Sequence, residues 1–468
     1  MRFKKARNVL CFLVLCLLII LGIGGHAFAA GTFTELQTLI NATPVGGTLD
    51  INQDYEFVSA DAAVISSDGI LISKAIVLDA HGHTVSAAGN MRVFLIDGVT
   101  GSAVLTIKNI RITEGGKVAS GSAISIAESN NVNFDKCIIT KNGTVSGTHT
   151  ADGGAIFIDS KAAVEFKDCE ISGNLGADRA AGVYIRGNVK FEGCTIKDNL
   201  GSSRAGGIYV DPGYQAPKRG GEWGGNVVMK NCTITGNTAG RGAGIYVNSE
   251  NEKLNIFEDC LFENNKTVRS PGNGGGILFY NAHARMTNCA IIDNEADKGS
   301  GVLIDVQTDV TLENCTITGN KATGAFGGGL LCHDGSYPTD TMKPAGKVRI
   351  LNSTIILNVA SGDVKDDIYI NWSPNDDKST DVSLGPWISR YDGMITSGGK
   401  NQIGVLVNPK NFIKSTSDKI DTTKANLPKG HPDENFLTPD GGCNAGFGFA
   451  VLLLAGIIAI RKPLRKPE

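Results

Sequence analysis

The sequence predicts an all-β fold in which the chain winds into a parallel β-helix of about ten coils, closed at its N-terminal end by a short helix. Two observations predict it. A six-residue motif that ends with Asn recurs eight times, seven times beginning with Cys and once with Ser, with first residues 25 to 38 positions apart. Between its copies a second motif recurs, two small residues followed by an aliphatic residue. A short fixed core with variable spacing is typical of a solenoid with one coil per repeat.

Both motifs have the residue types of short strands. The first motif occupies Cys137–Asn142, Cys169–Asn174, Cys194–Asn199, Cys232–Asn237, Cys260–Asn265, Cys289–Asn294, Cys315–Asn320 and Ser353–Asn358. The second occupies Gly154–Ile158, Ala181–Ile185, Gly206–Val210, Ala243–Val247, Gly275–Phe279, Ser300–Ile304 and Gly328–Cys332. Ahead of each Cys an alternating piece such as Val164-x-Phe166 adds a third strand signal. We therefore expect three strands in each coil, stacked at ~4.8 Å.

The repeated polar and small residues have structural explanations. The Gly pairs suit tight corners that need positive φ or a close backbone approach. The Asn at the end of each motif suits a left-handed turn, and stacked Asn side chains can bond one another. The Cys row is expected to be reduced and buried, although adjacent coils bring cysteines close enough for a disulfide.

The N-terminal residues predict export and a cap. Residues 1–29 have the pattern of a signal peptide, with four basic residues before an apolar run and a small-x-small cleavage site that ends at Ala29. Residues 30–45 predict a short amphipathic helix with Thr32 as N-cap. This helix would cover the open end of the β-helix, which we place at residues 46–370.

The C-terminal residues predict a stalk and an anchor. Residues 371–440 lose the repeat and predict an end coil and a polar stalk. Residues 441–468 contain Gly441, Gly442, Cys443 and Asn444, then an uncharged run and a basic tail. This pattern resembles bacterial C-terminal sorting signals of the GlyGly-CTERM and Synerg-CTERM type. The resemblance implies processing by a sorting enzyme and attachment to the cell surface; a plain single-pass membrane anchor is the alternative.

The repeats resemble the right-handed parallel β-helix superfamily, which includes pectate lyases and polymorphic outer membrane proteins. The second group is the closer match, because its motifs appear here as Gly153-Gly-Ala-Ile156 and Phe262-Glu-Asn-Asn265. The resemblance covers roughly residues 46–370 and implies a right-handed coil. Those membrane proteins end in an autotransporter barrel, for which the residues after 371 lack the repeated alternation, so the adhesin role is an analogy.

The net charge of the chain argues against nucleic acid as a partner. The net charge of −3 becomes −7 without the signal peptide and −10 without residues 443–468. An acidic ectodomain in which 6% of residues are aromatic is a poor nucleic-acid binder. The expected partners are a cell-surface or extracellular glycan or protein, and the membrane through the C-terminal segment.

Candidate binding residues are the positions that break the repeat. Four residues before the aliphatic residue of the second motif, a basic row is formed by Arg179, Arg204, Arg241 and Lys298, interrupted by Asn273. The row could grip an acidic glycan, or its charges could pair with Asp178 or Asp297. The two longest insertions, 211–225 and 333–346, leave the coil at one corner. They carry Tyr214, Lys218, Arg219, Trp223, His333, Asp334 and Tyr337. These residues suit sugar stacking, or packing on the wall.

No catalytic residue, metal site or cofactor is predicted. The pair His81 and His83 suggests a metal site, but no third ligand is apparent in the sequence, so a surface turn is the expectation. We expect an exported, surface-anchored adhesin-like or structural module with possible glycan binding. The alternative is a carbohydrate-active enzyme, a polysaccharide lyase or glycoside hydrolase. Carboxylates and a basic residue converging within about 6 Å in a groove on the wall would favour the enzyme.

Overall fold

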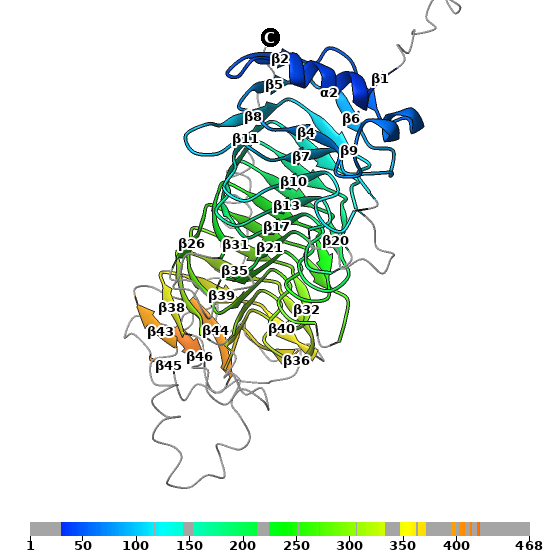
Figure 1. Ribbon diagram of the computed structural model, residues 1–468. Coiled ribbons are helices and arrows are strands. Elements are labelled where there is room, and N and C mark those ends of the chain that lie inside the picture. The colour runs from blue at the N-terminus through cyan, green and yellow to red at the C-terminus, as the bar shows by residue number, and fades with distance from the viewer. Residues whose placement is uncertain are drawn as a thin grey trace, which may run out of the picture.

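The structure is a computed structural model. It describes residues 30–116, 118–143, 153–176, 178–212, 224–249, 253–270, 272–305, 307–332, 347–361, 364–370, 395–398, 402–407, 412–413 and 419–421. These residues form a parallel solenoid of about nine turns, which confirms the predicted fold class. Figure 1 shows the coils stacked along one axis, from the blue N-terminal end to the orange C-terminal strands.

Each coil contributes one strand to each of three walls. Wall 1 is made of the alternating strands, which are β2 (Thr48–Asp50), β5 (Val77–Asp79), β8 (Leu105–Lys108), β11 (Asn131–Asp135), β14 (Ala163–Lys167), β18 (Asn188–Glu192), β22 (Asn226–Lys230), β26 (Leu254–Glu258), β30 (His283–Thr287), β34 (Asp309–Glu313), β38 (Lys347–Leu351), β43 (Ile395–Gly398) and β45 (Phe412–Ile413).

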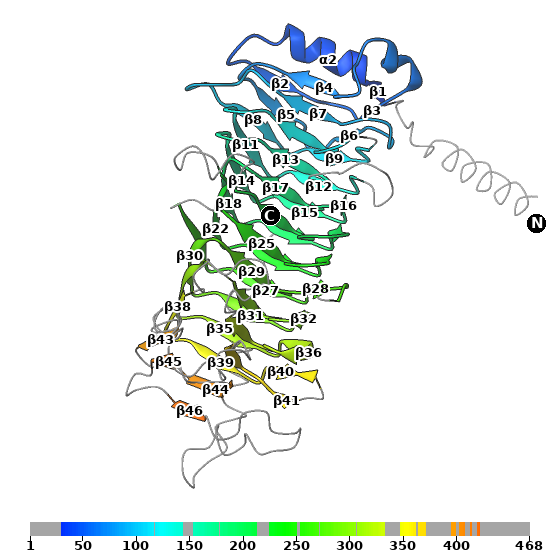
Figure 2. The same ribbon diagram turned by 60° about the horizontal axis from the view of Figure 1, so that its bottom comes forward.

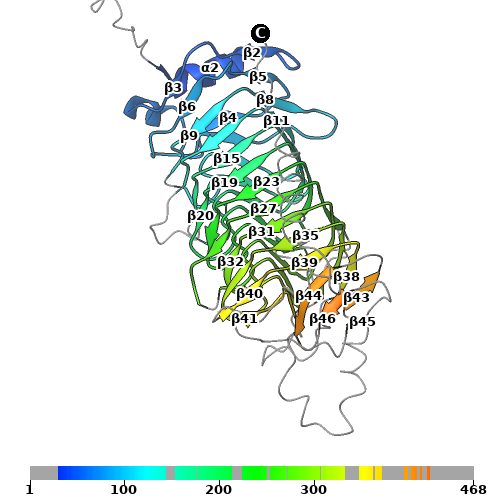
Figure 3. The same cartoon turned by 180° about the vertical axis from the view of Figure 1, so that it is seen from behind.

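Wall 2 follows the Cys positions; seen from behind in Figure 3, its strands lie one above another. Its strands are β1 (Gly31–Thr32), β3 (Tyr55–Glu56), β6 (Thr84–Ser86), β9 (Arg111–Thr113), β12 (Ile138–Thr140), β15 (Glu170–Ser172), β19 (Thr195–Lys197), β23 (Thr233–Thr235), β27 (Leu261–Glu263), β31 (Ala290–Ile292), β35 (Thr316–Thr318), β39 (Thr354–Ile356), β44 (Gln402–Val407) and β46 (Lys419–Asp421).

Wall 3 follows the Gly-Gly motif. Its strands are β4 (Ile70–Ile72), β7 (Phe94–Ile96), β10 (Ile124–Ile126), β13 (Ile156–Ile158), β17 (Val183–Ile185), β21 (Ile208–Val210), β25 (Ile245–Asn248), β29 (Ile277–Tyr280), β33 (Val302–Ile304), β37 (Leu330–Cys332) and β42 (Ile368–Ile370). Short strands lie at the corner between walls 2 and 3: β16 (Leu175–Gly176), β20 (Leu200–Gly201), β24 (Thr238–Ala239), β28 (Lys266–Thr267), β32 (Glu295–Lys298), β36 (Lys321–Phe326), β40 (Val359–Ala360) and β41 (Val364–Lys365).

Equivalent residues stack in register, so the interior is built from columns of like side chains. Phe134, Phe166 and Phe191 of wall 1 are buried and stack with ring centroids 4.7 and 4.9 Å apart. The seven cysteines from Cys137 to Cys315 form another column, and they are buried, as expected. Each column removes apolar surface from water in every coil, which a single coil could not do alone.

The Asn residues that end the first motif form a continuous buried ladder, shown for its middle member. The Nδ2 of Asn237 donates to Ile196 O at 3.0 Å and to Asn265 Oδ1 at 3.0 Å. Its Oδ1 accepts from the backbone N–H and the Nδ2 of Asn199 at 3.2 and 2.9 Å. The same pattern repeats from Asn142 to Asn358. At the last rung Asp367 Oδ1 accepts from Asn358 Nδ2 at 2.8 Å.

The turn prediction for these Asn residues was wrong by one position. The left-handed residue is the one before each Asn, namely Lys141, Gly173, Asp198, Gly236, Asn264, Asp293, Gly319 and Leu357. The second Gly of the Gly-Gly motif serves the ladder by close approach: a Cβ on Gly207 would overlap the carbonyl oxygen of Gly244 in the next coil.

The helix α2 (Phe33–Ala42) covers the N-terminal end, as Figure 2 shows. As predicted, Thr32 is its N-cap and forms a capping box with Glu35. Phe33, Leu36 and Ile40 face the core and are buried. The short 3-10 helix η1 (Ser59–Ala63) follows β3. Because the end coil would otherwise expose unpaired strand edges, the helix also protects the molecule from edge-to-edge association.

The termini carry the targeting predictions. Residues 1–29, most of the stalk and residues 441–468, including Gly441, Gly442, Cys443 and Asn444, lie outside the described residues. In the part of the chain that the structure describes, no helix has the length and apolar character needed to cross a membrane.

We predict that Asn237→Asp destabilises the protein by about 3 kcal/mol or more, because a carboxylate cannot donate to Ile196 O and Asn265 Oδ1 inside a dry core. Chemical denaturation measures the loss. Asn133→Ala, on the exposed face of wall 1, is the control and should change stability by less than about 0.5 kcal/mol. Equal stability of the two variants would contradict a structural ladder.

Asp366 gives a pH-dependent prediction. Burial, together with the charge of Asp367, raises the pKa of Asp366 to about 7, although the Gly327 N–H donates to its Oδ2 at 2.6 Å. The folded state therefore binds more protons than the unfolded state between about pH 4 and pH 7, and stability falls as pH rises through this window. Asp366→Asn mimics the protonated form. It should match the wild type at pH 4 and exceed its unfolding free energy by on the order of 2–4 kcal/mol at pH 8. Parallel stability curves for the two proteins would contradict this.

Candidate functional site

The predicted basic row is real in its geometry. Arg204 and Arg241 are direct partners in adjacent coils, and so are Asn273 and Lys298. All four residues are half-buried. Arg204 lies over the ring of Tyr209 at 5.9 Å, and Lys298 Nζ lies 5.7 Å from the centroid of the Phe326 ring. These cation–π contacts orient the charges at the corner where wall 3 begins.

Arg179, the first member of the row, has carboxylate partners. Its Nε lies 3.8 Å from Asp178, which is the pairing considered from the sequence. Its Nη1 lies 3.1 Å from Asp211 Oδ2 and 2.9 Å from Tyr184 Oη. Arg179 therefore differs from the rest of the row, because it reaches across wall 3 to the next coil.

Asp211 gathers a cluster of polar side chains at the far edge of wall 3. Tyr184 Oη donates to its Oδ2, and Arg186 Nη2 donates to Tyr184 Oη at 3.2 Å. The side chain of Asp211 is 7% exposed, and Tyr184 is fully buried. We call Arg179, Tyr184, Arg186 and Asp211 the Asp211 cluster.

The cluster has the composition of a proton-transfer site. Two guanidinium groups donate to one phenol oxygen and so stabilise its phenolate, while the carboxylate can take the phenol proton. Equally, a buried carboxylate needs such partners for stability alone. The arrangement brings a carboxylate and basic groups within the distance set for the enzyme alternative, but Tyr184 and Asp211 are buried and the cluster does not line a groove on the wall.

A column of aromatic and aliphatic side chains lies on the outer side of wall 3. Phe157 stacks on Tyr184 at 5.4 Å, Tyr184 on Tyr209 at 5.4 Å, and Tyr246 meets Tyr209 edge-on at 5.1 Å. Leu278, Leu303 and Leu331 continue the column and are buried. The three tyrosines are at most 9% exposed, so their ring faces are not free for sugar stacking.

The loop candidates Tyr214, Lys218, Arg219, Trp223, His333, Asp334 and Tyr337 lie outside the described residues. The structure does place the points where both loops leave the wall. One follows β21 and the other follows β37, and these strands are four steps apart in wall 3. The Asp211 cluster lies at the start of the first loop.

Sequence reasoning missed Tyr184, Arg186 and Asp211 as a group, because no motif contains all three. Tyr184 lies within β17, Arg186 follows that strand, and Asp211 follows β21 in the next coil. A usable signal existed: Arg186 and Asp211 each directly follow the last residue of a wall 3 strand, in neighbouring coils. Opposite charges at equivalent positions of a solenoid indicate a pair across coils.

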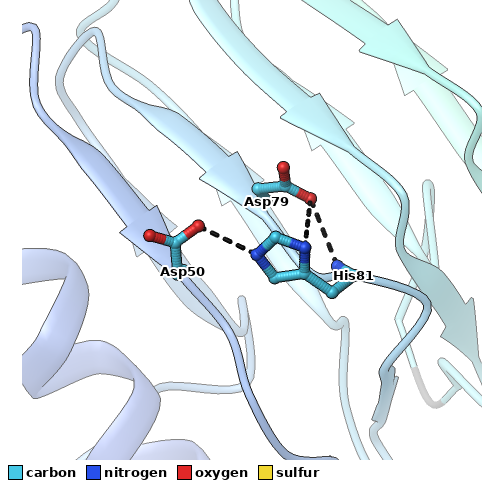
Figure 4. A group of neighbouring side chains, drawn as sticks. All are labelled: Asp50, Asp79 and His81. Atoms are coloured by element: carbon cyan, nitrogen blue, oxygen red, sulfur yellow. Dashed lines mark hydrogen bonds and ion pairs between the residues drawn. The ribbon is translucent and has the colours of Figure 1, made fainter.

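Sequence reasoning also missed the carboxylates around His81. Figure 4 shows His81 between Asp50 and Asp79, with its Nε2 2.9 Å from Asp50 Oδ1. One atom from each of the three lies within 4.8 Å of the others, which is a ligand-like spacing. No third ligand was apparent in the sequence because Asp50 lies on β2 and Asp79 on β5, one coil later.

Asp79, the buried carboxylate of the His81 group, already has partners inside the protein. Asp79 lies 2.9 Å from Lys108 Nζ and accepts from Asn109 Nδ2 at 2.9 Å. Burial alone would raise the pKa of Asp79, but these hydrogen bonds outweigh it and lower the pKa to about 2. A metal ion would have to displace Lys108, so we interpret the group as a clamp between the first coils.

Comparison with known proteins gives the following matches. The family model described as "Right handed beta helix region" matches residues 62–268 and 155–366. No curated protein matches the chain. Among solved structures, the chain is similar to the A-module of Azotobacter vinelandii mannuronan C-5 epimerase AlgE4, at 13% identity and a TM-score of 0.48, over 85% of this chain and 98% of that one. The A-module of epimerase AlgE6 from the same organism has 10% identity and a TM-score of 0.42, over 86% and 97%.

Proposed function

Because the chain belongs to the right-handed β-helix family, we propose that it is an exported, surface-anchored module that binds an acidic polysaccharide along the basic row of wall 3. The observation that carries the proposal is the direct stacking of Arg204 on Arg241, continued by Asn273 and Lys298. A polymer with a carboxylate on successive sugars would meet cations at ~4.8 Å intervals.

The electrostatics support an anionic ligand at this row. Without its two terminal segments the chain has a net charge of −10, so the rest of its surface repels a polyanion. The basic row is then a locally positive surface on a negatively charged protein. Its cations are oriented by ring contacts. Orientation before binding reduces the entropy lost when the ligand is held.

The proposed location rests on sequence. The charged start and apolar run of residues 1–29 support export, and Gly441–Asn444 followed by an apolar run and a basic tail support surface anchoring. The mass of the mature protein tests this: a chain that keeps residues 444–468 would contradict processing by a sorting enzyme.

A second candidate function is that of a carbohydrate-active enzyme, and the Asp211 cluster favours it. A lyase needs a base beside a uronate and a cation to neutralise the acid group. Asp211 and Tyr184 could supply the base, and Arg179 and Arg186 the cations. A glycoside hydrolase needs two carboxylates facing the substrate. Both carboxylates here, those of Asp178 and Asp211, lie against the guanidinium of Arg179. A cation placed beside the base suits a lyase, which must neutralise the acid group of the uronate, so the lyase is the better fit.

We predict that Arg204→Gln combined with Arg241→Gln weakens binding of polygalacturonate and alginate about tenfold or more, because two oriented cations are lost. Affinity electrophoresis at two salt concentrations measures the loss, which should shrink at high salt. Arg285→Gln is the control, since Arg285 is exposed on wall 1 and pairs with Glu313 at 2.7 Å. Equal affinity of the double variant and the wild type would contradict the proposal.

If the protein is a lyase, incubation with a uronate polymer should yield unsaturated products that absorb in the ultraviolet. Asp211→Asn should then lower the rate by about 100-fold or more while polymer binding persists, because the base is removed and the basic row is not. A thermal melt checks that the variant is folded. Absence of unsaturated products from all uronate polymers would exclude the lyase and leave the binding module.

A further inference from the structure

The outer face of wall 1 is hollowed into an open groove of about 510 Å³. It crosses β11, β14, β18 and β22 and is bounded at one end by the turn that precedes β8. It is lined by Gly101, Ser102, Val104, Asn131, Asn133, Ala163, Val164, Glu165, Asn188, Val189, Lys190, Asn226 and Val228. The basic row and the Asp211 cluster contribute nothing to this lining. The groove is therefore a separate surface.

Three Asn side chains in the groove are each held by the wall on one side only. Asn131 Nδ2 donates to Gly101 O at 2.7 Å, and Asn226 Nδ2 donates to Leu254 O at 2.8 Å. Asn188 Oδ1 accepts from Lys253 Nζ at 3.0 Å. Because a carbonyl can only accept and an ammonium can only donate, these bonds fix which end of each amide faces outward.

The amide atoms of these Asn side chains that face outward include both hydrogen-bond acceptors and a donor. Among the described residues, no partner occupies the Oδ1 of Asn131 or Asn226, or the Nδ2 of Asn188. Asn133 is exposed, and neither end of its amide is bonded there. The groove thus presents oriented acceptors and donors in turn along the axis. The small or short side chains of Ala163 and Val228 lie between these Asn residues and do not fill the groove.

The groove has no net charge. Its lining contains one carboxylate and one ammonium group, Glu165 and Lys190, and these pair at 2.9 Å. Hydrogen bonds to Glu165 and Glu192 also raise the pKa of Lys190, so its ammonium group stays charged at neutral pH. Such a surface gives no advantage to a charged ligand and suits one that is polar and uncharged.

We propose that this groove binds an uncharged polysaccharide strand, at a site separate from the basic row of wall 3 and its acidic polysaccharide. Sugar hydroxyl groups donate and accept at once, which matches the mixture of free amide ends. The lining spans five coils, about 19 Å between its outer strands, which has room for several sugar rings in a row. A peptide strand is a poorer fit, because the backbone groups of wall 1 are already used in its ladder.

Two walls with different ligands would give the protein a bridging role. The basic row would hold an acidic strand and the wall 1 groove a neutral strand, so that one molecule joins two polymers of a surface matrix. The bridging step rests on the proposed function, whereas the groove site stands without it. Hydrogen bonds without aromatic stacking give weak single contacts, so we expect affinity to come from the polymer's repeated units.

The test measures the retention of the full-length protein by soluble neutral polysaccharides, namely hydroxyethylcellulose, galactomannan and xylan, and by polygalacturonate. We expect the wild type to bind at least one neutral polymer. Asn133→Ala combined with Asn188→Ala should weaken that binding about tenfold and leave polygalacturonate binding unchanged, since two outward amides are lost. Arg204→Gln combined with Arg241→Gln should do the reverse. A thermal melt confirms that both double variants are folded.

Three results would overturn the groove proposal. One is no retention of the wild type by any of the neutral polymers. Another is equal retention of the wild type and the Asn133→Ala, Asn188→Ala variant. The third is weakened polygalacturonate binding in that variant, which would assign the groove to the acidic polymer. If the acidic polymer fails to bind while neutral binding remains sensitive to the Asn pair, the function proposed for wall 3 fails and the groove stands.

Discussion

The buried Asn ladder is the interaction on which the rest of the structure depends. Each amide in it bonds the coil before and the coil after, so neighbouring coils can stack in only one register. That register carries over to every other column, including the cysteines, the Phe stack of wall 1 and the basic row. A shift of the register by one residue would turn the polar face of each strand toward the core. It would also leave the Asn amides without hydrogen-bond partners in a dry core. The ladder therefore fixes the outside of the molecule as well as the inside.

Much of this could be predicted from the sequence, because repeated residues see repeated surroundings. The strands, the Cys column, the N-cap at Thr32 and the stacking of Arg204 on Arg241 all follow from motif spacing. The unpredicted features come from residues outside the repeat. Asp50 meets His81, and Arg179 meets Asp211, because these side chains reach from their own coil to a position in the next coil that is not the equivalent one. The spacing of the motifs determines which positions stack on one another, but it does not determine which residue the tip of a long side chain contacts.

The walls differ in what their outer faces offer. Wall 3 combines cations, a buried aromatic column and a carboxylate cluster, and both long loops leave from its edge. Wall 1 offers amides and one internal ion pair on a shallow, uncharged surface. Because the ladder and the core columns hold the backbone, side chains on either face can change without changing the fold. The scaffold thus separates stability, which is internal, from recognition, which is external.

The ladder also has a direction. Every Oδ1 points toward the coil before it, and one N–H of every Nδ2 points toward the coil after it, so the amide dipoles add up along the axis, as peptide dipoles do in an α-helix. The positive end of this row lies at Asn358, and the residue that meets it is Asp367, which stands at the second-Gly position of the Gly-Gly motif. Its carboxylate accepts the hydrogen bond that the next Asn side chain accepts in the other coils. A negative group there opposes the accumulated dipole, much as an anion does at a helix N-terminus. The rod therefore has an electrical polarity, and its last rung is the charge that completes it.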